Sequence, residues 1–276
     1  MKQSSPAVNL QLFFVAILLF VWSWGSLALA QDNSSSVPEP PLNEQSLVYD
    51  LTMNGQIVGQ RRVRIQYLPA SSKLPYGSRI VESWTSLDYD VPLTGKNISY
   101  TKRATGHFSA RGSKFVSVVD VAGDGFEFQG NQRQGGMWNI YEQQGKDLSQ
   151  RKLSSSEMQS FSLALFDPGQ LEQWISGANR NIYHVEMGEL WTGSWTQLPS
   201  KSISVGDVTL EGIAMHYQST HGELDVLWSD SGLVLDFTLR VNGLVLDANL
   251  RSLPAPPQFG NIAPILQFDG VEEESL

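Results

Sequence analysis

Hydrophobic and polar residues alternate over most of the chain between residues 46 and 253, in short segments separated by Gly and Asn. The pattern is clearest near the end of this region. Asn242-Gly243 is a favoured two-residue hairpin turn, because both positions need a positive φ. A turn there opposes three apolar pairs: Val241 with Leu244, Leu239 with Leu246, and Phe237 with Ala248. The residues between these pairs are mostly polar, so the hairpin has one face for the core and one for solvent.

The same pattern predicts the rest of the fold. Asn54-Gly55 marks a second hairpin turn, and Gly59 in its return strand indicates a bulge or a close approach of two backbones. Further strands are predicted along the chain, one of them over residues 160–166. One short helix is predicted over Pro168–Ile175, because Asp167 can cap it. About twelve to fourteen strands and one helix predict an all-β domain, either a large curved antiparallel sheet or a half-open barrel.

Residues 1–30 have the pattern of a secretory signal peptide. Lys2 precedes an unbroken apolar run of 11 residues, Leu12 to Trp22, and the small residues Ala28 and Ala30 precede Gln31. A membrane-spanning helix needs about 20 apolar residues. We therefore expect cleavage after Ala30 and a periplasmic or secreted mature chain. The alternative is an uncleaved anchor in the inner membrane.

Composition divides the remainder into three parts. Residues 31–45 are rich in Ser and Pro and predict a polar linker, residues 46–253 a single antiparallel β domain, and residues 254–276 a Pro-rich, acidic tail. Within the tail, Ile262 to Phe268 is apolar enough to dock on a domain. No cysteine is present, so neither a disulfide nor a lipid-modified cysteine is expected.

The net charge argues against two classes of partner. The formal charge is −9, and removing Lys2 with the signal peptide gives −9 − 1 = −10. An acidic chain repels phosphate backbones and anionic membrane surfaces. We expect no nucleic-acid partner, and a membrane contact only through an uncleaved signal.

No set of residues has catalytic or metal-ligating spacing, and we expect no metal and no cofactor. His216 and His221 are five residues apart, which places them on opposite faces of a strand. An enzyme would need titratable side chains that converge in a pocket. The candidates for such a group are His184, Glu186, His216 and Asp225.

Tryptophan and methionine are the stronger candidates for ligand contact. Packing in the core is the simpler interpretation of Trp in an antiparallel sheet. The alternative is that these side chains line a concave cavity for an apolar ligand. The candidate lining residues are Trp84, Trp138, Met187, Trp191, Trp195, Met215 and Trp228.

From Tyr49 to Leu253 the chain resembles a group of exported bacterial domains of unknown function. The resemblance is carried by the segment from Tyr49 to Gly59, by the Gly- and Val-rich segment from Ile203 to Gly212, and by Leu224 to Gly232. Members often have Trp-Tyr-Asp where this chain has Trp228-Ser229-Asp230, so no role of that tyrosine transfers. The group is similar to the lipoprotein-carrier (LolA-like) architecture. This implies a curved antiparallel sheet over an apolar cavity, and no reaction.

These observations favour a periplasmic binding or carrier module for an apolar, lipid-like ligand. The alternative is a non-enzymatic interaction or scaffolding protein of the envelope, which would bind a protein partner through its linker, the segment Ile262 to Phe268 and its tail. A third hypothesis is an enzyme of unknown class.

Overall fold

The computed structural model describes residues 43–68, 78–91, 96–133, 135–176 and 179–252, and all described elements fall within one compact unit. The predicted signal peptide (1–30), the linker up to residue 42 and the predicted tail (254–276) lie outside the described residues. The first strand begins at Asn43 and the last ends at Ser252. The sheet therefore starts three residues before the predicted boundary at residue 46.

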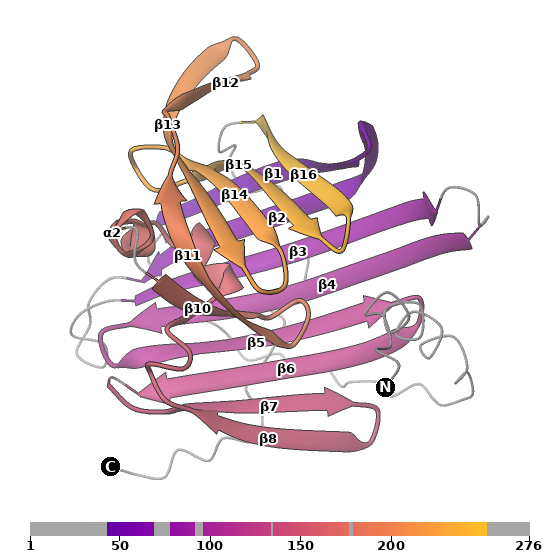
Figure 1. Cartoon of the computed structure of the whole chain (residues 1–276), viewed down its shortest axis with the longest axis vertical. Helices are drawn as coiled ribbons and strands as arrows, with labels where there is room; N and C mark the ends of the chain where they lie inside the picture. The colour runs from indigo at the N-terminus through magenta and orange to yellow at the C-terminus, as the bar shows by residue number, and fades with distance from the viewer. Residues whose placement is uncertain (1–42, 69–77, 92–95, 134, 177–178, 253–276) are drawn as a thin grey trace, which may run out of the picture. The chain divides into compact units, whose positions relative to one another are not determined.

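The described residues form one open, curved sheet of sixteen strands, which confirms the predicted fold class with slightly more strands than the predicted twelve to fourteen (Figure 1). The first eight pair as consecutive antiparallel neighbours: β1 (Asn43–Met53), β2 (Gln56–Leu68), β3 (Ser78–Val91), β4 (Lys96–Ser109), β5 (Gly112–Val121), β6 (Asp124–Arg133), β7 (Trp138–Gln144) and β8 (Asp147–Leu153). The others are β9 (Ser160–Phe161), β10 (Asn179–His184), β11 (Glu189–Gln197), β12 (Lys201–Val205), β13 (Val208–Ser219), β14 (Glu223–Trp228), β15 (Val234–Val241) and β16 (Leu244–Ser252).

The last strand returns to the first. β16 pairs with β1, so the order is β8-β7-β6-β5-β4-β3-β2-β1-β16-β15-β14-β13-β11-β10-β9, and β12 pairs only with β13. The strand pairs are antiparallel except β9 with β10. The path ends at β8 on one side and β9 on the other, which is the half-open arrangement expected.

The two predicted Asn-Gly turns are confirmed. Asn54 and Gly55 have φ of 52° and 76°, and Asn242 and Gly243 have φ of 53° and 81°. The register of β15 and β16 contains the three predicted apolar pairs. Gly59 satisfies both expectations: the register shifts beside it, and a Cβ atom there would lie 2.1 Å from the carbonyl oxygen of Ser86.

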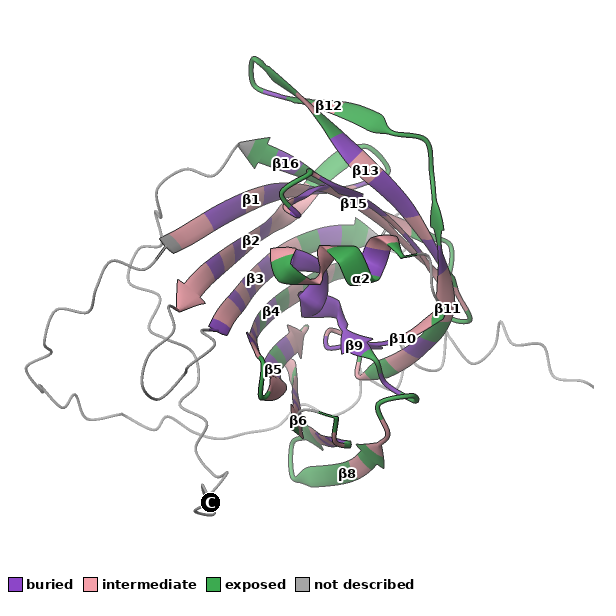
Figure 2. Ribbon diagram, turned by 90° about the vertical axis from the view of Figure 1, so that its left-hand side faces the viewer, coloured by how far each residue is buried: buried purple, intermediate pink, exposed green. Residues whose placement is uncertain are grey.

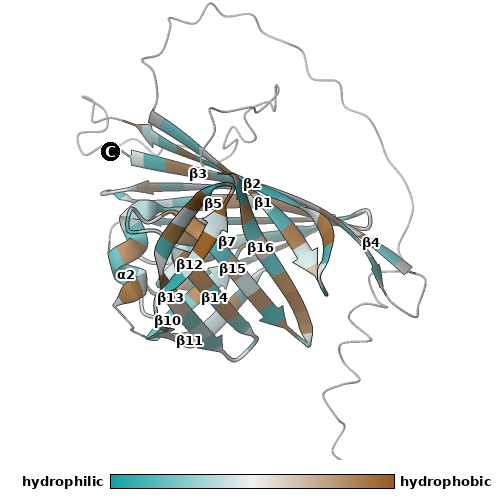
Figure 3. Cartoon of the chain, turned by 90° about the horizontal axis from the view of Figure 1, so that it is seen from above, coloured by the Kyte–Doolittle hydropathy of each residue, from teal (hydrophilic) through white to brown (hydrophobic). Residues whose placement is uncertain are grey.

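The alternation places one face of each strand in the core. In Figure 3 apolar and polar segments alternate along β14, β15 and β16. On β4 the even-numbered residues Lys102, Ala104 and Phe108 are buried, whereas Thr101 and Arg103 are exposed. We call the face that carries the buried residues the inner face of the sheet.

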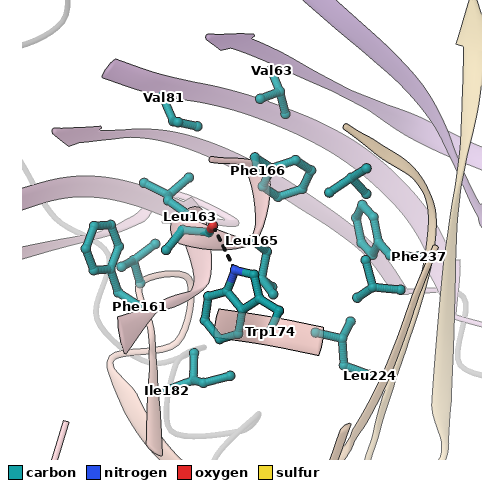
Figure 4. Packing of buried hydrophobic residues seen from close by; sticks show 14 of the residues in the cluster. Val63, Val81, Phe161, Leu163, Leu165, Phe166, Trp174, Ile182, Leu224 and Phe237 are labelled. Atoms are coloured by element: carbon teal, nitrogen blue, oxygen red, sulfur yellow. Dashed lines mark hydrogen bonds between the residues drawn. The ribbon is translucent and has the colours of Figure 1, made fainter. Parts of the chain in front are cut away.

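A short segment of the chain fills the space enclosed by the sheet (Figure 2). The strand predicted over 160–166 is wrong beyond Phe161, because Ser162–Phe166 forms a 3-10 helix, η1. All five of its residues are buried, which a strand with alternating faces would not allow. Figure 4 shows Leu163, Leu165 and Phe166 pointing into the core beside Trp174, whose Nε1 donates to the Ala164 carbonyl at 3.2 Å.

The predicted helix is confirmed. It consists of a 3-10 turn, η2 (Pro168–Gln170), followed by α2 (Leu171–Ile175). The Asp167 carboxylate accepts a hydrogen bond from the Gly169 backbone N–H at 3.1 Å, as expected of a cap. It also accepts hydrogen bonds from Nε and Nη2 of Arg79. No helix among the described residues is long and apolar enough to cross a membrane.

Candidate functional site

Arg61, Thr85 and Lys102 lie side by side on the inner face of three neighbouring strands. The register pairs Arg61 of β2 with Thr85 of β3, and Thr85 with Lys102 of β4. Residues directly opposite each other in antiparallel strands share a face. All three side chains are buried. The same row continues to Val119 of β5 and Phe126 of β6.

Glu186 reaches this row from the turn between β10 and β11. Its Oε1 pairs with Lys102 Nζ and with Arg61 Nη2, the latter at 3.2 Å. Its Oε2 accepts a hydrogen bond from the Ser162 hydroxyl, which in turn accepts from the Val185 N–H at 3.3 Å. One carboxylate therefore connects two strands of the sheet, the buried η1 segment and its own turn.

Further contacts fix the Arg61 guanidinium. Its Nε donates to Ser83 Oγ at 3.0 Å. The guanidinium carbon lies 4.6 Å from the centre of the Phe166 ring and 5.4 Å from that of Phe237. Arginine is suited to such a site, because its planar group can stack on rings while its nitrogens pair with a carboxylate.

Burial is the largest influence on the pKa values in this cluster. It lowers the pKa of Lys102 from 10.5 to about 7, although Glu186 acts to raise it. Burial acts to raise the pKa of Glu186, but Lys102 and Arg61 outweigh it and hold that pKa below its ordinary value. Burial also lowers the pKa of His184 to about 4, so its ring is neutral at pH 7. An ionised carboxylate thus sits between a permanent cation and a lysine whose charged form is disfavoured by burial.

Two buried hydroxyls beside the cluster lack a hydrogen-bond partner within the described part of the chain. They are Thr85 Oγ1, between the two cations in the row, and Ser117 Oγ on β5. Buried hydroxyls normally find a partner, so each such group calls for an explanation. We use the name cation row for Arg61, Thr85 and Lys102.

A pocket of about 270 Å³ lies beside β6, β7 and β8, near the open edge of the sheet. It is lined by Phe126, Phe128, Glu142, Gln143, Gln144, Asp147, Leu148 and Ser149. The row that starts at Arg61 and passes Lys102 and Val119 reaches this pocket at Phe126. Leu148 is 66% exposed, and the register places its side chain on the face opposite that of Phe126 and Phe128. The β10–β11 turn lies beside this pocket as well, because a Cβ atom on Gly188 would be 2.4 Å from the Phe128 ring. The turn therefore extends over the inner face from the cation row to Phe128.

Most of the residues predicted to line a cavity are packed in the core. Trp138, Trp191, Trp195, Met215 and Trp228 are buried, and the rings of Trp195 and Trp228 lie 5.6 Å apart. Met187 is part of the β10–β11 turn and is partly exposed. Trp84 lies on the opposite face of the sheet, 5.5 Å from the Arg62 guanidinium. Ligand contact by these seven residues stays a prediction.

The four candidate acid–base residues do not converge. His184 and Glu186 lie at the cation row. His216 Nδ1 and Asp225 Oδ1 are 2.6 Å apart on β13 and β14. Met215 and Tyr217 flank His216 and are fully buried, so alternation places His216 on the other face of the sheet. The described residues contain no group of three or more His, Cys, Asp or Glu side chains that could hold a metal ion. We assign no reaction to this arrangement.

Arg61 and Lys102 were not predicted as buried cations, although the alternation indicates them. Lys102 has the same parity as Ala104 and Phe108, and Arg61 the same parity as Val63 and Ile65. A cation in register with apolar residues on a half-buried strand predicts a buried charge. Its partner Glu186 could not be predicted, because a turn residue has no register with the sheet.

Comparisons with known proteins agree with the fold. No family model matches the chain, and no curated protein matches it. Among solved structures, the crystal structure of a beta-barrel-like protein of the domain of unknown function DUF1849 from Brucella abortus is similar, with a TM-score of 0.54 and 10% identity over 78% of this chain and 98% of that chain. At this identity the likeness shows the fold alone. The chain thus shares a β-barrel-like fold with a domain of unknown function.

Proposed function

We propose that this chain is an exported binding or carrier module of the bacterial envelope that holds an apolar, lipid-like group in the pocket between β6, β7 and β8. The observation that carries the proposal is the pair of aromatic side chains Phe126 and Phe128, which share the inner face and line one hollow at the open edge of the sheet. The signal-peptide pattern of residues 1–30 supports the location.

The pocket is a better ligand site than the centre of the sheet. The centre is filled by the chain itself, since Trp138, Trp174 and Trp228 are almost completely buried there. Phe126 by contrast is only partly buried, and covering its remaining apolar surface stabilises a complex by about 25 cal/mol per Å². The volume of about 270 Å³ is close to the lower end of the range of roughly 300–1,000 Å³ for small-molecule sites.

The proposal predicts that an apolar probe binds at Phe126. The neutral dye N-phenyl-1-naphthylamine, which fluoresces in apolar surroundings, is titrated into residues 31–276. Phe126→Ser should weaken its affinity at least roughly tenfold, because an aromatic contact worth about 1.4 kcal/mol or more is lost. Leu244→Ser is the control, since Leu244 is also an apolar residue with exposed surface but lies in the β15–β16 hairpin.

Equal loss of affinity in the two variants, or no binding by the unmodified chain, would contradict the proposal. The natural ligand is then sought by native mass spectrometry of the chain purified from a bacterial periplasm, followed by solvent extraction. A reproducible extra mass that extracts as lipid would support a carrier. The alternative of an envelope scaffolding protein stays a prediction, because the linker up to residue 42 and the tail on which it depends lie outside the described residues.

A further inference from the structure

The cation row and Glu186 together carry more positive than negative charge. Arg61 and Lys102 each pair with Glu186, and within the described residues no second carboxylate forms an ion pair with either cation. With Lys102 protonated, Arg61, Lys102 and Glu186 together carry a net charge of +1. An uncompensated charge is unfavourable in a buried site, and a second anion would offset it.

Thr85 gives the row an unused hydrogen-bond donor. Its Oγ1 is buried between Arg61 and Lys102 and has no partner among the described residues. Ser117 Oγ on β5 is also buried without a partner among the described residues. Ser117 lies opposite Ala104, two residues along β5 from Val119, which is opposite Lys102. Two cationic groups and two free hydroxyls on one small area form a donor set for one anionic group such as a carboxylate.

Glu186 differs from the other charged groups because it belongs to a turn. The turn between β10 and β11 lies in front of β4 and β5 in Figure 1, and the ion pair with Lys102 places it in contact with the sheet. The Glu186 side chain is 16% exposed, whereas that of Lys102 is fully buried. If the turn moves outward, the volume of the Glu186 carboxylate becomes free beside both cations. No preformed cavity is then required.

We propose that the cation row binds the anionic headgroup of an amphipathic ligand, and that Glu186 occupies this site while the ligand is absent. This inference rests on the proposed function and names its ligand class, a lipid-like molecule with a single carboxylate or similar anion. The headgroup replaces the Glu186 carboxylate against Arg61 and Lys102 and accepts a hydrogen bond from Thr85.

The path from the row to the pocket fits such a ligand. Lys102 is opposite Val119, and Val119 is opposite Phe126, which lines the pocket. Neighbouring strands are about 4.8 Å apart, so two steps cover about 10 Å. A headgroup at Lys102 therefore leaves an acyl chain to run along the inner face, beneath the β10–β11 turn, into the pocket.

The test compares two probes that differ in headgroup charge. Dodecanoate and dodecan-1-ol are used at pH 7 to displace N-phenyl-1-naphthylamine from the unmodified chain, from Glu186→Gln and from Thr85→Val. Glu186→Gln removes the internal competitor, so the affinity for dodecanoate should rise at least tenfold while that for dodecan-1-ol changes little. Thr85→Val should lower the affinity for dodecanoate severalfold.

Thr85→Val keeps both charges and the side-chain shape, so it tests the site even if Glu186→Gln does not fold. Ser46→Ala is its matched control, because Ser46 Oγ is also buried without a partner but lies on β1, opposite Arg64. The inference is overturned if both probes displace the dye but neither variant changes the preference for dodecanoate, a result that leaves the proposed function intact. If neither probe displaces the dye, the proposed function fails too.

Discussion

Lys102 shows how packing and charge oppose each other at one residue. Its side chain lies on the buried face of β4, beside the apolar residues Ala104 and Phe108 of the same strand. Burial lowers its pKa from 10.5 to about 7. Between these two values the unfolded chain binds more protons than the folded chain. Stability therefore rises with pH across that window, because the unfolded state loses its proton advantage.

A pH series should detect this single lysine. Between pH 7 and 9 the free energy of unfolding should increase with pH in the unmodified chain by on the order of 1 kcal/mol per pH unit more than in Lys102→Met, which has no titrating group there. Urea unfolding at pH 7, 8 and 9 gives both slopes. Parallel slopes in the two chains would show that the pKa of Lys102 is not lowered in the folded chain.

At the scale of elements, the β10–β11 turn is held by shape as well as by charge. Gly188 has φ of +67°, and a Cβ atom added to it would be 2.4 Å from the Phe128 ring. Gly206, in the turn between β12 and β13, has a similar φ of +58°, but a Cβ atom there would meet nothing within 4 Å. The two glycines share the backbone requirement and differ only in packing.

Alanine at these two positions should therefore separate the two effects. Gly206→Ala should cost about 1 kcal/mol, from the left-handed backbone alone. Gly188→Ala should cost roughly 1–3 kcal/mol more, because the turn must lift off Phe128 or the ring must move. Urea unfolding of both variants measures the difference. Adding Phe128→Leu to Gly188→Ala should recover part of the loss, and equal costs for the two alanines would show that the turn does not press on the ring.

The elements that the sequence predicted well are those in which two local signals agree. The Asn242-Gly243 turn and the apolar pairs beside it specify the same register, and the structure has it. Residues 163–166 have apolar side chains at neighbouring positions, so no period indicates η1. No strand was predicted over Asp147–Leu153, because β8 is exposed over most of its length and has no buried face that the alternation could indicate.

The candidate site was only partly accessible to the same reasoning. Alternation assigns Trp84 and Lys102 to a face of their strands, but it does not show what covers that face. The segment from Met158 to Trp174 covers the inner face, and its position depends on contacts between distant parts of the chain. That is why alternation alone could not decide between core packing and a cavity lining for the tryptophans, and why the buried ion pair was not predicted.

At the scale of the whole sheet, the two halves of the chain depend on each other. β1 pairs with β16 across almost the entire described sequence, and Tyr49 on β1 donates from its hydroxyl to the Val234 carbonyl at 2.7 Å. Between the halves, Trp228 of β14 donates from Nε1 to the Leu165 carbonyl of η1 at 3.0 Å. Contacts this distant in sequence form late and are lost together.

The described strands should therefore unfold as one cooperative unit, although the sheet is open. Fluorine-labelled tryptophan gives separate resonances for Trp138 on β7 and Trp228 on β14, which Trp→Phe variants assign. Both should lose their native signals at the same urea concentration, and far-UV circular dichroism should follow the same curve. Loss of the Trp228 signal at lower urea than that of Trp138 would show that β1–β8 persist alone. In that case the inner face of β2–β4, with its two buried cations, would have to tolerate water without η1 and Glu186.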